Sequence, residues 1–317
     1  MEIVHTSVLL QECLSYLAPD RSDSLMIDGT LGEGGHTEAF LTAFPELRVI
    51  GIDADVRIQA RARERLAPFG ERICFYPGWS DDFFREYPAD AKRPDRILID
   101  LGISLFHYEK SGRGFSFRSD EPLDMRLDPQ TERSAADIVN GLGENDLANL
   151  IYQLGEERYS RRIAKAIVES RRASRFTTSK ALAESIYHAV PADYRHGRIH
   201  PATRTFQALR IAVNRELDRL PGLLDLALAT LAPGGKFGVI TFHSLEDRIV
   251  KNFFRDASKS CICPPEVPIC KCRGRPLVEV LTKKAVSPTD EEIDRNSPSR
   301  SARLRVVRKI AYGDDKL

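Results

Sequence analysis

A glycine-rich segment near the start of the chain limits the possible folds more than any other feature. Residues 25–28 form a short apolar run without a helical period, which predicts a buried strand. A second apolar run ends at Asp53. The first run is followed by Gly29, Gly32, Gly34 and Gly35. In open parallel sheets, a glycine loop after the first strand and an acid after the second bind an adenosine ligand. The sequence therefore predicts such a ligand above the strand ends.

The charges of this loop indicate which kind of ligand. Asp28 and Glu33 flank the glycines, and the order G-x-G-x-x-G is absent. A dinucleotide site presents bare backbone N–H groups to a pyrophosphate, which an acid in the loop would repel. The loop favours a ligand with positive charge and no phosphate, and S-adenosylmethionine fits because it carries a sulfonium and an ammonium group. A tight turn between an ordinary strand and helix is the alternative.

Length and targeting signals bound the class of protein. The chain has 317 residues, which suggests roughly two domains. No apolar run approaches the length needed to span a membrane, and the N-terminus lacks the pattern of a secretory signal. We therefore expect a cytoplasmic protein that does not bind membranes.

The net charge of +1 hides a segregation of charge along the chain. Residues 1–150 carry 16 Lys+Arg against 27 Asp+Glu, whereas residues 151–215 carry 13 against 5 and residues 255–310 carry 13 against 7. Such segregation favours a basic surface for a polyanion beside an acidic body. A solvated helix face is the alternative.

The six cysteines fall into two groups. Cys13 and Cys74 lie among apolar residues and are expected in the core. The others form a C-x-C-x6-C-x-C cluster, Cys261, Cys263, Cys270 and Cys272. Four thiolates can hold zinc, but structural zinc sites usually have C-x2-C or wider spacing. Zinc and reduced thiols in a loop both remain open, and no other metal site is expected.

Strand and helix patterns alternate, which predicts an α/β fold with a doubly wound parallel sheet and right-handed crossovers. From about residue 105 to 212 the strand pattern gives way to helices. We expect a discontinuous sheet domain of residues 1–104 and 213–317, and an inserted, basic, helical domain of residues 105–212. The expected helices are 6–17, 146–154, 158–170, 179–190 and 202–220; the expected strands are 25–28, 49–53, 73–76, 96–100, 236–242, 277–283 and 303–310; and residues 284–302 are expected to be an exposed loop.

Candidate chemical residues follow the strand ends. Asp100 ends the fourth strand and should lie near the reacting atoms, with hydrogen bonding to backbone N–H groups of the next loop as the alternative. The loop after it contains Arg113, Phe115 and Phe117, a combination that can grip single-stranded bases, although the two rings could equally pack in a core. His243, after the fifth strand, is a candidate for substrate contact or a structural histidine.

The helix that begins near His200 has two faces. Phe206, Leu209 and Val213 form an apolar stripe that should be core. The other face carries Arg204, Gln207, Arg210 and Asn214, which suggests contact with nucleic acid or ligand, with simple solvation as the alternative. Ser244 followed by Asp247 suggests a helix-entry box after the fifth strand.

Six segments of the chain resemble one family in the same order. They are Asp-Gly-Thr-Leu-Gly-Glu-Gly-Gly-His-Thr from residue 28, Asp-Leu-Gly-Ile-Ser from 100, Arg-Gly-Phe-Ser-Phe from 113, Pro-Leu-Asp-Met-Arg from 122, His-Pro-Ala-Thr-Arg-Thr-Phe-Gln-Ala-Leu-Arg-Ile-Ala-Val-Asn from 200 and Phe-His-Ser-Leu-Glu-Asp-Arg from 242. The family is the bacterial small-subunit rRNA (cytosine-N4)-methyltransferases, called RsmH or MraW. Six segments in order are far more specific than a glycine loop.

The resemblance implies methyl transfer from S-adenosylmethionine to the exocyclic amine of a cytidine in the decoding region of 16S rRNA. It also implies that the doubly wound sheet is the Rossmann-like sheet of a class I methyltransferase, with residues 1–104 and 213–317 as the methyltransferase domain and residues 105–212 as the RNA-substrate domain. It places the cofactor on Gly34, Gly35, His36, Asp53, Trp79, Asp100 and His107. The chain departs from the family pattern at Trp79, where phenylalanine is usual, and at 104–107, where Ser-Leu-Phe-His replaces Ser-Ser-Pro-Gln. Histidine and glutamine can both donate a hydrogen bond. Candidate RNA contacts are Arg113, Phe115, Phe117, Arg204, Arg210, Asn214 and His243.

A cytosine amine is a poor nucleophile because its lone pair is delocalised into the ring. Catalysis must position the nitrogen and provide an acceptor for its hydrogens, and Asp100 or the backbone carbonyls of residues 100–103 are the candidates. A small-molecule methyltransferase and a non-catalytic RNA-binding protein of ribosome assembly remain alternatives, while the loop acids disfavour a nicotinamide dehydrogenase. We expect a late, partly assembled small subunit as the substrate rather than naked rRNA; the oligomeric state stays open.

Overall fold

The chain divides into two compact units, seen in the computed structural model that describes residues 7–197, 199–261, 263, 266, 269 and 274–312. The sheet unit comprises Met1–Ile103 and Arg219–Leu317, and the helical unit comprises Ser104–Asp218. We expected the helical segment at 105–212, so the helical unit extends six residues further toward the C-terminus than the sequence pattern suggested.

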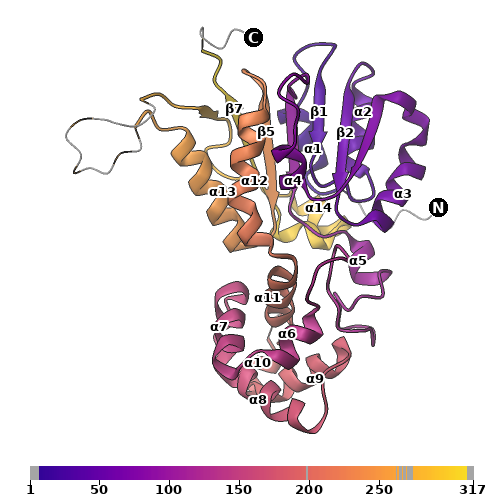
Figure 1. Ribbon diagram of the computed structural model, residues 1–317, viewed down its shortest axis with the longest axis vertical. Helices are drawn as coiled ribbons and strands as arrows, with labels where there is room; N and C mark the ends of the chain where they lie inside the picture. The colour runs from indigo at the N-terminus through magenta and orange to yellow at the C-terminus, as the bar shows by residue number, and fades with distance from the viewer. Residues whose placement is uncertain are drawn as a thin grey trace. The chain divides into compact units, whose positions relative to one another are not determined.

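A seven-stranded sheet with the order β3-β2-β1-β4-β5-β7-β6 forms the centre of the sheet unit (Figure 1). Its strands are β1 (Leu25–Asp28), β2 (Arg48–Asp53), β3 (Ile73–Pro77), β4 (Arg96–Asp100), β5 (Lys236–Thr241), β6 (Val278–Val280) and β7 (Arg303–Lys309). Strands β1 to β5 pair in parallel, whereas β7 runs antiparallel to both β5 and β6. The predicted doubly wound α/β fold is confirmed.

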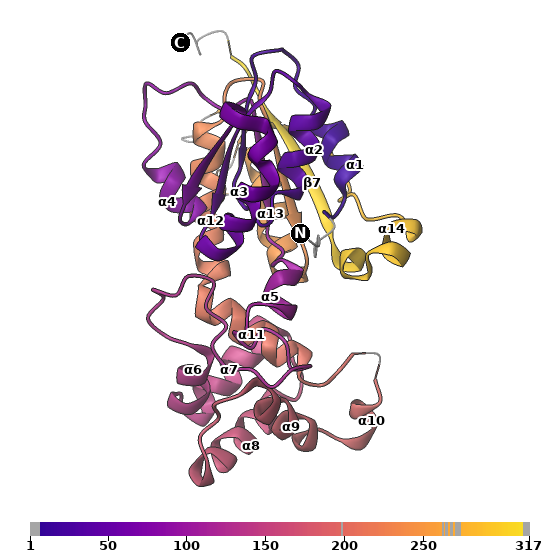
Figure 2. The same ribbon diagram turned by 90° about the vertical axis from the view of Figure 1, so that its right-hand side faces the viewer.

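Helices cover both faces of this sheet because alternate strand residues point to opposite sides. One face packs on α1 (Leu10–Tyr16), α2 (Gly35–Ala43) and α3 (Val56–Leu66); the other packs on α4 (Ser80–Arg85), α12 (Glu216–Thr230) and α13 (Ser244–Ala257). In β1, for example, Met26 faces the first layer and Ile27 the second. Figure 2 shows α1 and α2 on one side of the sheet and α12 on the other.

The carboxyl ends of the parallel strands meet at one edge of the sheet. Asp28, Asp53 and Asp100 are the last residues of β1, β2 and β4. The chain crosses from one side of β1 to the other between β3 and β4, which makes the ends of β1 and β4 a topological switch point where such sheets bind ligands. Three carboxylates therefore lie at the edge where a ligand is expected.

Three local predictions for the sheet unit were wrong. Residues 284–302 are not a plain loop, because they contain α14 (Asp290–Arg295) and a short 3-10 helix (Ser297–Ser301). The box that starts α13 is formed by His243 and Glu246, not by Ser244 and Asp247. Cys74 is exposed rather than buried, because it lies on β3, the edge strand of the sheet.

The helical unit is built from short helices that pack on one another. They are α5 (Leu105–Glu109), α6 (Ala135–Gly141), α7 (Glu144–Gly155), α8 (Ser160–Ala173), α9 (Ser179–Ala189), α10 (Ala192–Arg195) and α11 (Thr203–Asn214). Helix α7 packs against both α8 and α11, so their apolar stripes form the core. The helix expected at 202–220 is broken at Arg215, which has a left-handed φ of 51°. In the described part of the chain, we find no helix with the length and apolar character of a membrane span.

Candidate functional site

The loop between β1 and α2 brings its backbone close to neighbouring elements, and its glycines make this possible. Gly34 has a φ of 81° and caps α2, and a Cβ there would lie 2.9 Å from the Leu66 side chain. A Cβ on Gly29 would lie 2.9 Å from the Ile99 side chain, and one on Gly35 would collide with the Ser7 hydroxyl. Because no larger side chain fits at these three glycines, the loop presents its backbone there at the edge of the sheet.

The two acids that flank the glycines are paired within the protein. Asp28 is buried, its Oδ2 accepts the Thr37 hydroxyl at 2.7 Å and its Oδ1 accepts the Thr30 N–H at 3.2 Å. Glu33 is buried beside Arg61, whose Nε donates to Oε1 at 2.6 Å. The sequence argument used these two acids to predict a cationic ligand, and the structure shows that both carboxylates also hold the loop in shape.

Asp53 fixes the loop from the next strand. Its Oδ2 accepts the Gly32 N–H and its Oδ1 accepts the Asp55 N–H, both at 2.8 Å. The side chain is half-buried, and each carboxylate oxygen has a second lone pair. Asp53 can therefore stay anchored to the backbone while it accepts hydrogen bonds from a pair of ligand hydroxyls.

Asp100 lies at the switch point with little charge compensation. Its Oδ1 accepts the Gly102 N–H at 2.9 Å, and its Oδ2 lies 4.0 Å from Nδ1 of His36. The other ring nitrogen of His36 contacts the Val8 carbonyl at 2.9 Å, which fixes the imidazole. Burial raises the pKa of Asp100 to about 6, an effect that the nearby His36 and the Gly102 N–H partly offset. An ionised Asp100 therefore favours a positive ligand or a proton.

Trp79 provides an aromatic surface beside the same loop. It precedes α4, where the Ser80 hydroxyl donates to the Gly29 carbonyl. The Arg219 guanidinium lies 4.6 Å from the centre of the indole and is itself held by Asp81 at 2.6 Å. Sequence reasoning missed Arg219, and no local signal could have shown it, because 138 residues separate it from Asp81. Trp79 is thus a half-buried, fixed ring that can stack on a flat ligand.

Four features of this edge of the sheet together suit a cationic adenosine ligand. They are the glycine loop, the anchored carboxylate of Asp53, the ring of Trp79 and the buried carboxylate of Asp100. Comparison with known proteins decides the family: the model of the MraW methylase family matches residues 2–310. The chain belongs to the MraW methylase family. It is therefore a methyltransferase, and its methyl donor is S-adenosylmethionine.

Individual relatives agree over almost the whole chain. The chain is 68% identical to "Ribosomal RNA small subunit methyltransferase H" of Treponema denticola, across 98% of this chain and 99% of that protein. Proteins of the same name from Syntrophobacter fumaroxidans and Treponema pallidum are 48% and 46% identical, with coverage of 96% and 97% of this chain and 96% and 93% of theirs. The resemblance found in the six sequence segments is confirmed.

The sheet unit of this MraW-family chain brings six of the seven expected cofactor residues to the carboxyl edge of the sheet. They are Gly34, Gly35, His36, Asp53, Trp79 and Asp100. The seventh, His107, belongs to the helical unit, where it is buried on α5 and its ring lies 5.4 Å from that of Phe115.

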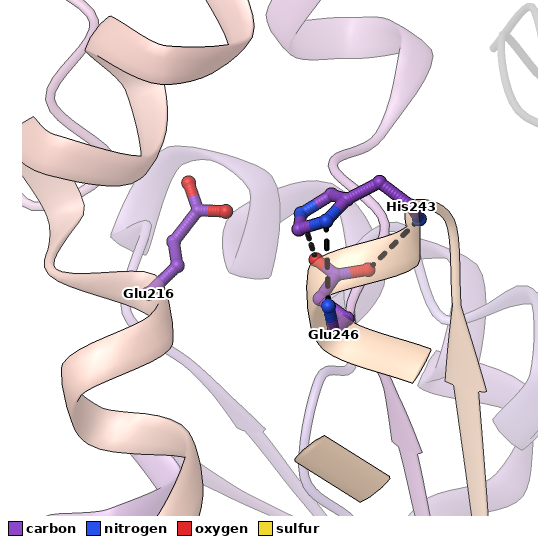
Figure 3. A group of neighbouring side chains, drawn as sticks. All are labelled: Glu216, His243 and Glu246. Carbon is purple, nitrogen blue, oxygen red and sulfur yellow. Dashed lines mark hydrogen bonds and ion pairs between the residues drawn. The ribbon is translucent and has the colours of Figure 1, made fainter. Parts of the chain in front are cut away.

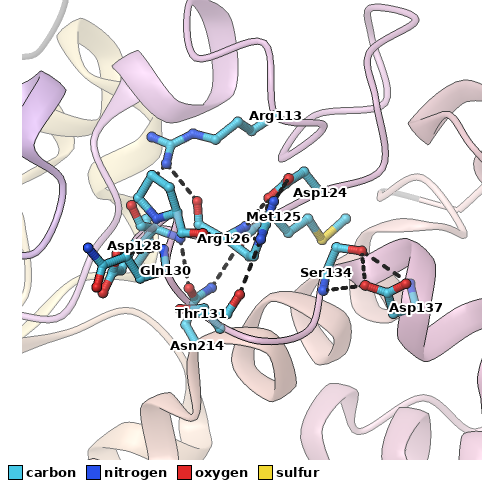
Figure 4. Close-up of polar contacts among 12 residues, drawn as sticks. Arg113, Asp124, Met125, Arg126, Asp128, Gln130, Thr131, Ser134, Asp137 and Asn214 are labelled. Atoms are coloured by element: carbon cyan, nitrogen blue, oxygen red, sulfur yellow. Dashed lines mark hydrogen bonds and ion pairs between the residues drawn. The ribbon is translucent and has the colours of Figure 1, made fainter.

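Arg113 and Asn214 hold one loop of the helical unit in place (Figure 4). Nη1 of buried Arg113 donates to the carbonyls of Arg126 and Leu127 at 2.7 and 2.9 Å. Asn214 is also buried, and it accepts the Leu127 N–H at 2.8 Å and donates to the Met125 carbonyl at 2.9 Å. The loop includes a left-handed Met125 with φ 61°, which these bonds stabilise. The structure thus gives both expected RNA contacts a role inside the unit.

The remaining candidates of the helical unit also have partners within it. Phe115 is buried, and the Phe117 ring packs on those of His200 and Phe206 at 4.5 and 5.0 Å. Arg210 forms a two-point ion pair with Glu216 at 3.0 and 2.8 Å, which ties α11 to the start of α12. Arg204 is half-buried, and its Nη1 donates to the Glu156 carbonyl at 3.3 Å.

His243 starts α13 rather than pointing freely from the strand end (Figure 3). Its Nδ1 accepts the Glu246 N–H at 3.4 Å, and its Nε2 lies 2.9 Å from Glu246 Oε1. The other carboxylate oxygen of Glu246 accepts the Phe242 N–H at 2.8 Å. His243 therefore has the structural role that the sequence left open as an alternative.

The cysteine cluster is only partly visible. Cys261 is exposed and Cys263 half-buried, whereas Cys270 and Cys272 lie outside the described residues.

Proposed function

We propose that this protein transfers a methyl group from S-adenosylmethionine to the N4 amine of a cytidine in the decoding region of 16S rRNA, acting on the small ribosomal subunit. The observation that carries the proposal is the 68% identity, over 98% of the chain, to a methyltransferase named for small-subunit ribosomal RNA. The site at the carboxyl edge of the sheet unit supports the proposal, because its residues fit the cationic adenosine portion of the methyl donor.

On the donor side, each residue of the sheet unit has a role that its contacts allow. Asp53 would accept the ribose hydroxyls while the N–H groups of Gly32 and Asp55 hold its carboxylate. Trp79 would stack on the adenine with its indole steadied by Arg219. The backbone at Gly34 and Gly35 would approach the ligand closely. The bound donor supplies an electrophilic methyl group on a sulfonium sulfur.

On the acceptor side, Asp100 would hold the hydrogens of the target amine. Drawing an N–H out of the ring plane localises the nitrogen lone pair, and a carboxylate accepts that hydrogen well. Because its pKa is raised to about 6, Asp100 is ionised at neutral pH yet binds a proton more readily than an ordinary aspartate. The surplus proton of the methylated amine would pass to this carboxylate and then to solvent.

We assign RNA binding by the helical unit to exposed cations rather than to the polar face of α11. Arg162 and Arg172 lie exposed on α8, and Arg175 and Lys180 lie exposed just beyond it. Arg204, Arg210 and Asn214, by contrast, are engaged inside the unit. Exposed guanidinium groups suit phosphate because their planar forks donate two parallel hydrogen bonds. His107 keeps the cofactor role that the family resemblance implies.

The test uses tritiated S-adenosylmethionine with three substrates: naked 16S rRNA, small subunits from cells that lack this activity, and a mixture of small metabolites. We expect label in the small subunits, at a higher rate than in naked rRNA, and none in the metabolites. Mass spectrometry of the digested rRNA should then show N4-methylcytidine. Label confined to metabolites, or a methyl group on another base or atom, would refute the proposal, and equal rates on naked rRNA would refute the preference for an assembled subunit.

A further inference from the structure

A second cavity opens at the same edge of the sheet unit, on the other side of β4 from the glycine loop. It has a volume of about 540 Å³ and lies at the carboxyl end of β5, between the start of α13, the 3-10 helix Ser297–Ser301 and the first residue of β7. Its lining includes His243, which the sequence named as a candidate substrate contact and which the structure ties to Glu246. The chemistry of the other lining residues indicates what the cavity binds.

The lining is rich in cationic side chains. Arg248, Lys251, Arg300 and Arg303 all line the cavity, and all four are exposed at the surface. The hydroxyl residues Ser244 and Ser301 lie between them. Lys251 sits two helical turns into α13, whereas Arg300 and Arg303 come from a segment about 50 residues later, so the fold brings these charges together.

Among the described lining residues, Lys251, Arg300 and Arg303 form no ion pair with an acid. Asp247 is the one carboxylate among the described lining residues, and Arg305 holds it with two hydrogen bonds of 2.8 and 2.9 Å. Glu246 is buried, and its Oε2 accepts the N–H groups of Phe242 and His243. The cavity therefore keeps a net positive charge, to which the N-terminus of the 14-residue α13 adds.

Cations gathered around one cavity repel each other, so the cluster is unfavourable for folding unless an anion binds there. Arginine forks and serine hydroxyls are the donors that phosphate oxygens accept best. The phenyl ring of Phe242 also lines the cavity and is only half-buried. Cationic side chains next to an accessible ring are typical of sites for single-stranded nucleic acid, where a base stacks while the backbone is neutralised.

We propose that this cavity binds backbone phosphates of the RNA strand that carries the target base. The inference rests on the proposed function, since it assigns part of the RNA substrate to the sheet unit. Strand β5 is the neighbour of β4, whose last residue is Asp100. A phosphate held at the end of β5 would anchor the strand one sheet position from the acceptor carboxylate, while the cations of the helical unit bind other parts of the RNA.

The test compares two double variants of the full-length protein that remove the same charge. Lys251→Gln/Arg300→Gln takes two cations from the cavity. Arg93→Gln/Arg308→Gln takes two exposed cations from the opposite, amino-terminal edge of the sheet, where Arg93 precedes β4 and Arg308 pairs with Lys236 at the start of β5. Binding of 16S rRNA and of unmethylated small subunits is measured against salt concentration, and binding of S-adenosylmethionine is measured by calorimetry.

We expect the cavity variant to bind RNA about tenfold more weakly than the wild type at roughly 0.1 M salt, with a slope of log K against log[salt] that is smaller by about 1.5, as loss of two phosphate contacts predicts. The matched control should bind RNA within about twofold of the wild type. Both variants should bind S-adenosylmethionine as the wild type does, because neither pair lies at the glycine loop.

Three outcomes would overturn the inference. The first is RNA binding by the cavity variant equal to that of the control. The second is equal weakening in both variants, which would indicate a general charge effect. The third is binding of inorganic phosphate to the wild type, lost in the cavity variant, with unchanged RNA affinity, which would identify a site for free anions. Failure of the proposed function looks different, since the wild type would then bind RNA but leave it unmethylated.

Discussion

Replacing Asp100 with asparagine should make the protein more stable and less active at the same time. The substitution keeps the size of the side chain and an oxygen that can accept the Gly102 N–H, which Asp100 Oδ1 accepts at 2.9 Å. It removes a negative charge that is nearly buried, with 12% of the side chain exposed. Two properties that usually fall together in a damaged protein should therefore move in opposite directions.

The size of the stability gain follows from the pKa. Burial raises the pKa of Asp100 from 3.8 to about 6. Because the pKa in the folded state is above that in the unfolded state, ionisation destabilises the fold, fully above pH 6 and hardly at all below pH 3.8. At about 1.4 kcal/mol per tenfold change in proton affinity, this cost is about 3 kcal/mol at pH 7.5 and about 1 kcal/mol at pH 4.5. Asp100→Asn should raise the free energy of unfolding by those amounts.

Urea unfolding at the two pH values measures the gain, and the fluorescence of Trp79, the one tryptophan of the chain, reports on the sheet unit. Turnover should fall by about 100-fold or more, the usual worth of a positioned proton acceptor. Calorimetry with S-adenosylmethionine shows whether the cofactor still binds. A variant no more stable than the wild type at pH 7.5, or a gain equal at both pH values, would refute the burial argument. Undiminished turnover with intact cofactor binding would refute the acceptor role.

Three further predictions concern other parts of the molecule. The single-turnover rate should fall as the pH drops through about 6, because Asp100 must be ionised to accept a proton, and a rate flat from pH 5 to 8 would contradict this. Trp79→Ala should weaken S-adenosylmethionine binding by about tenfold in calorimetry while Trp79→Phe stays near the wild type, because the ring provides the stacking surface; equal affinities for all three would exclude stacking. Asn214→Ala should lower the free energy of unfolding of the helical unit by about 2–4 kcal/mol in urea, since it leaves the Leu127 N–H and the Met125 carbonyl without partners, and a loss below about 0.5 kcal/mol would contradict that role.

The sequence predicted the central parallel strands β1 and β4 well because each contains a short apolar run, and such runs mark buried strands whatever they pair with. It predicted the helix at 202–220 less well, because the apolar period continues past Arg215, where the backbone turns left-handed. The helix at 290–295 did have a signal, since Thr289 followed by Glu292 is a capping pattern, and Thr289 accepts the Glu292 N–H at 3.2 Å. The pattern was hidden in a segment rich in turn-forming residues.

Candidate site residues could be identified by type, but their roles depended on partners far away in the sequence. Arg113 and Asn214 have the chemistry of RNA contacts, yet the structure uses both to hold backbone groups of one loop. Asp247 was expected at a helix entry but pairs with Arg305, 58 residues later. A polar residue in a motif is equally suited to bind a ligand or a buried peptide group, and only the three-dimensional contacts distinguish the two uses.

The charges of the sheet unit explain how one edge of a sheet could serve two substrates of opposite sign. Around the glycine loop, Asp28 and Glu33 have internal partners, and the proposed function uses Asp53 and Asp100 for the cationic donor. One strand further along, at the end of β5, the cavity is cationic because its acid is paired with an arginine. In the proposed function, opposite charges at neighbouring strand ends would keep a polyanion out of the donor pocket and a cation out of the phosphate cavity.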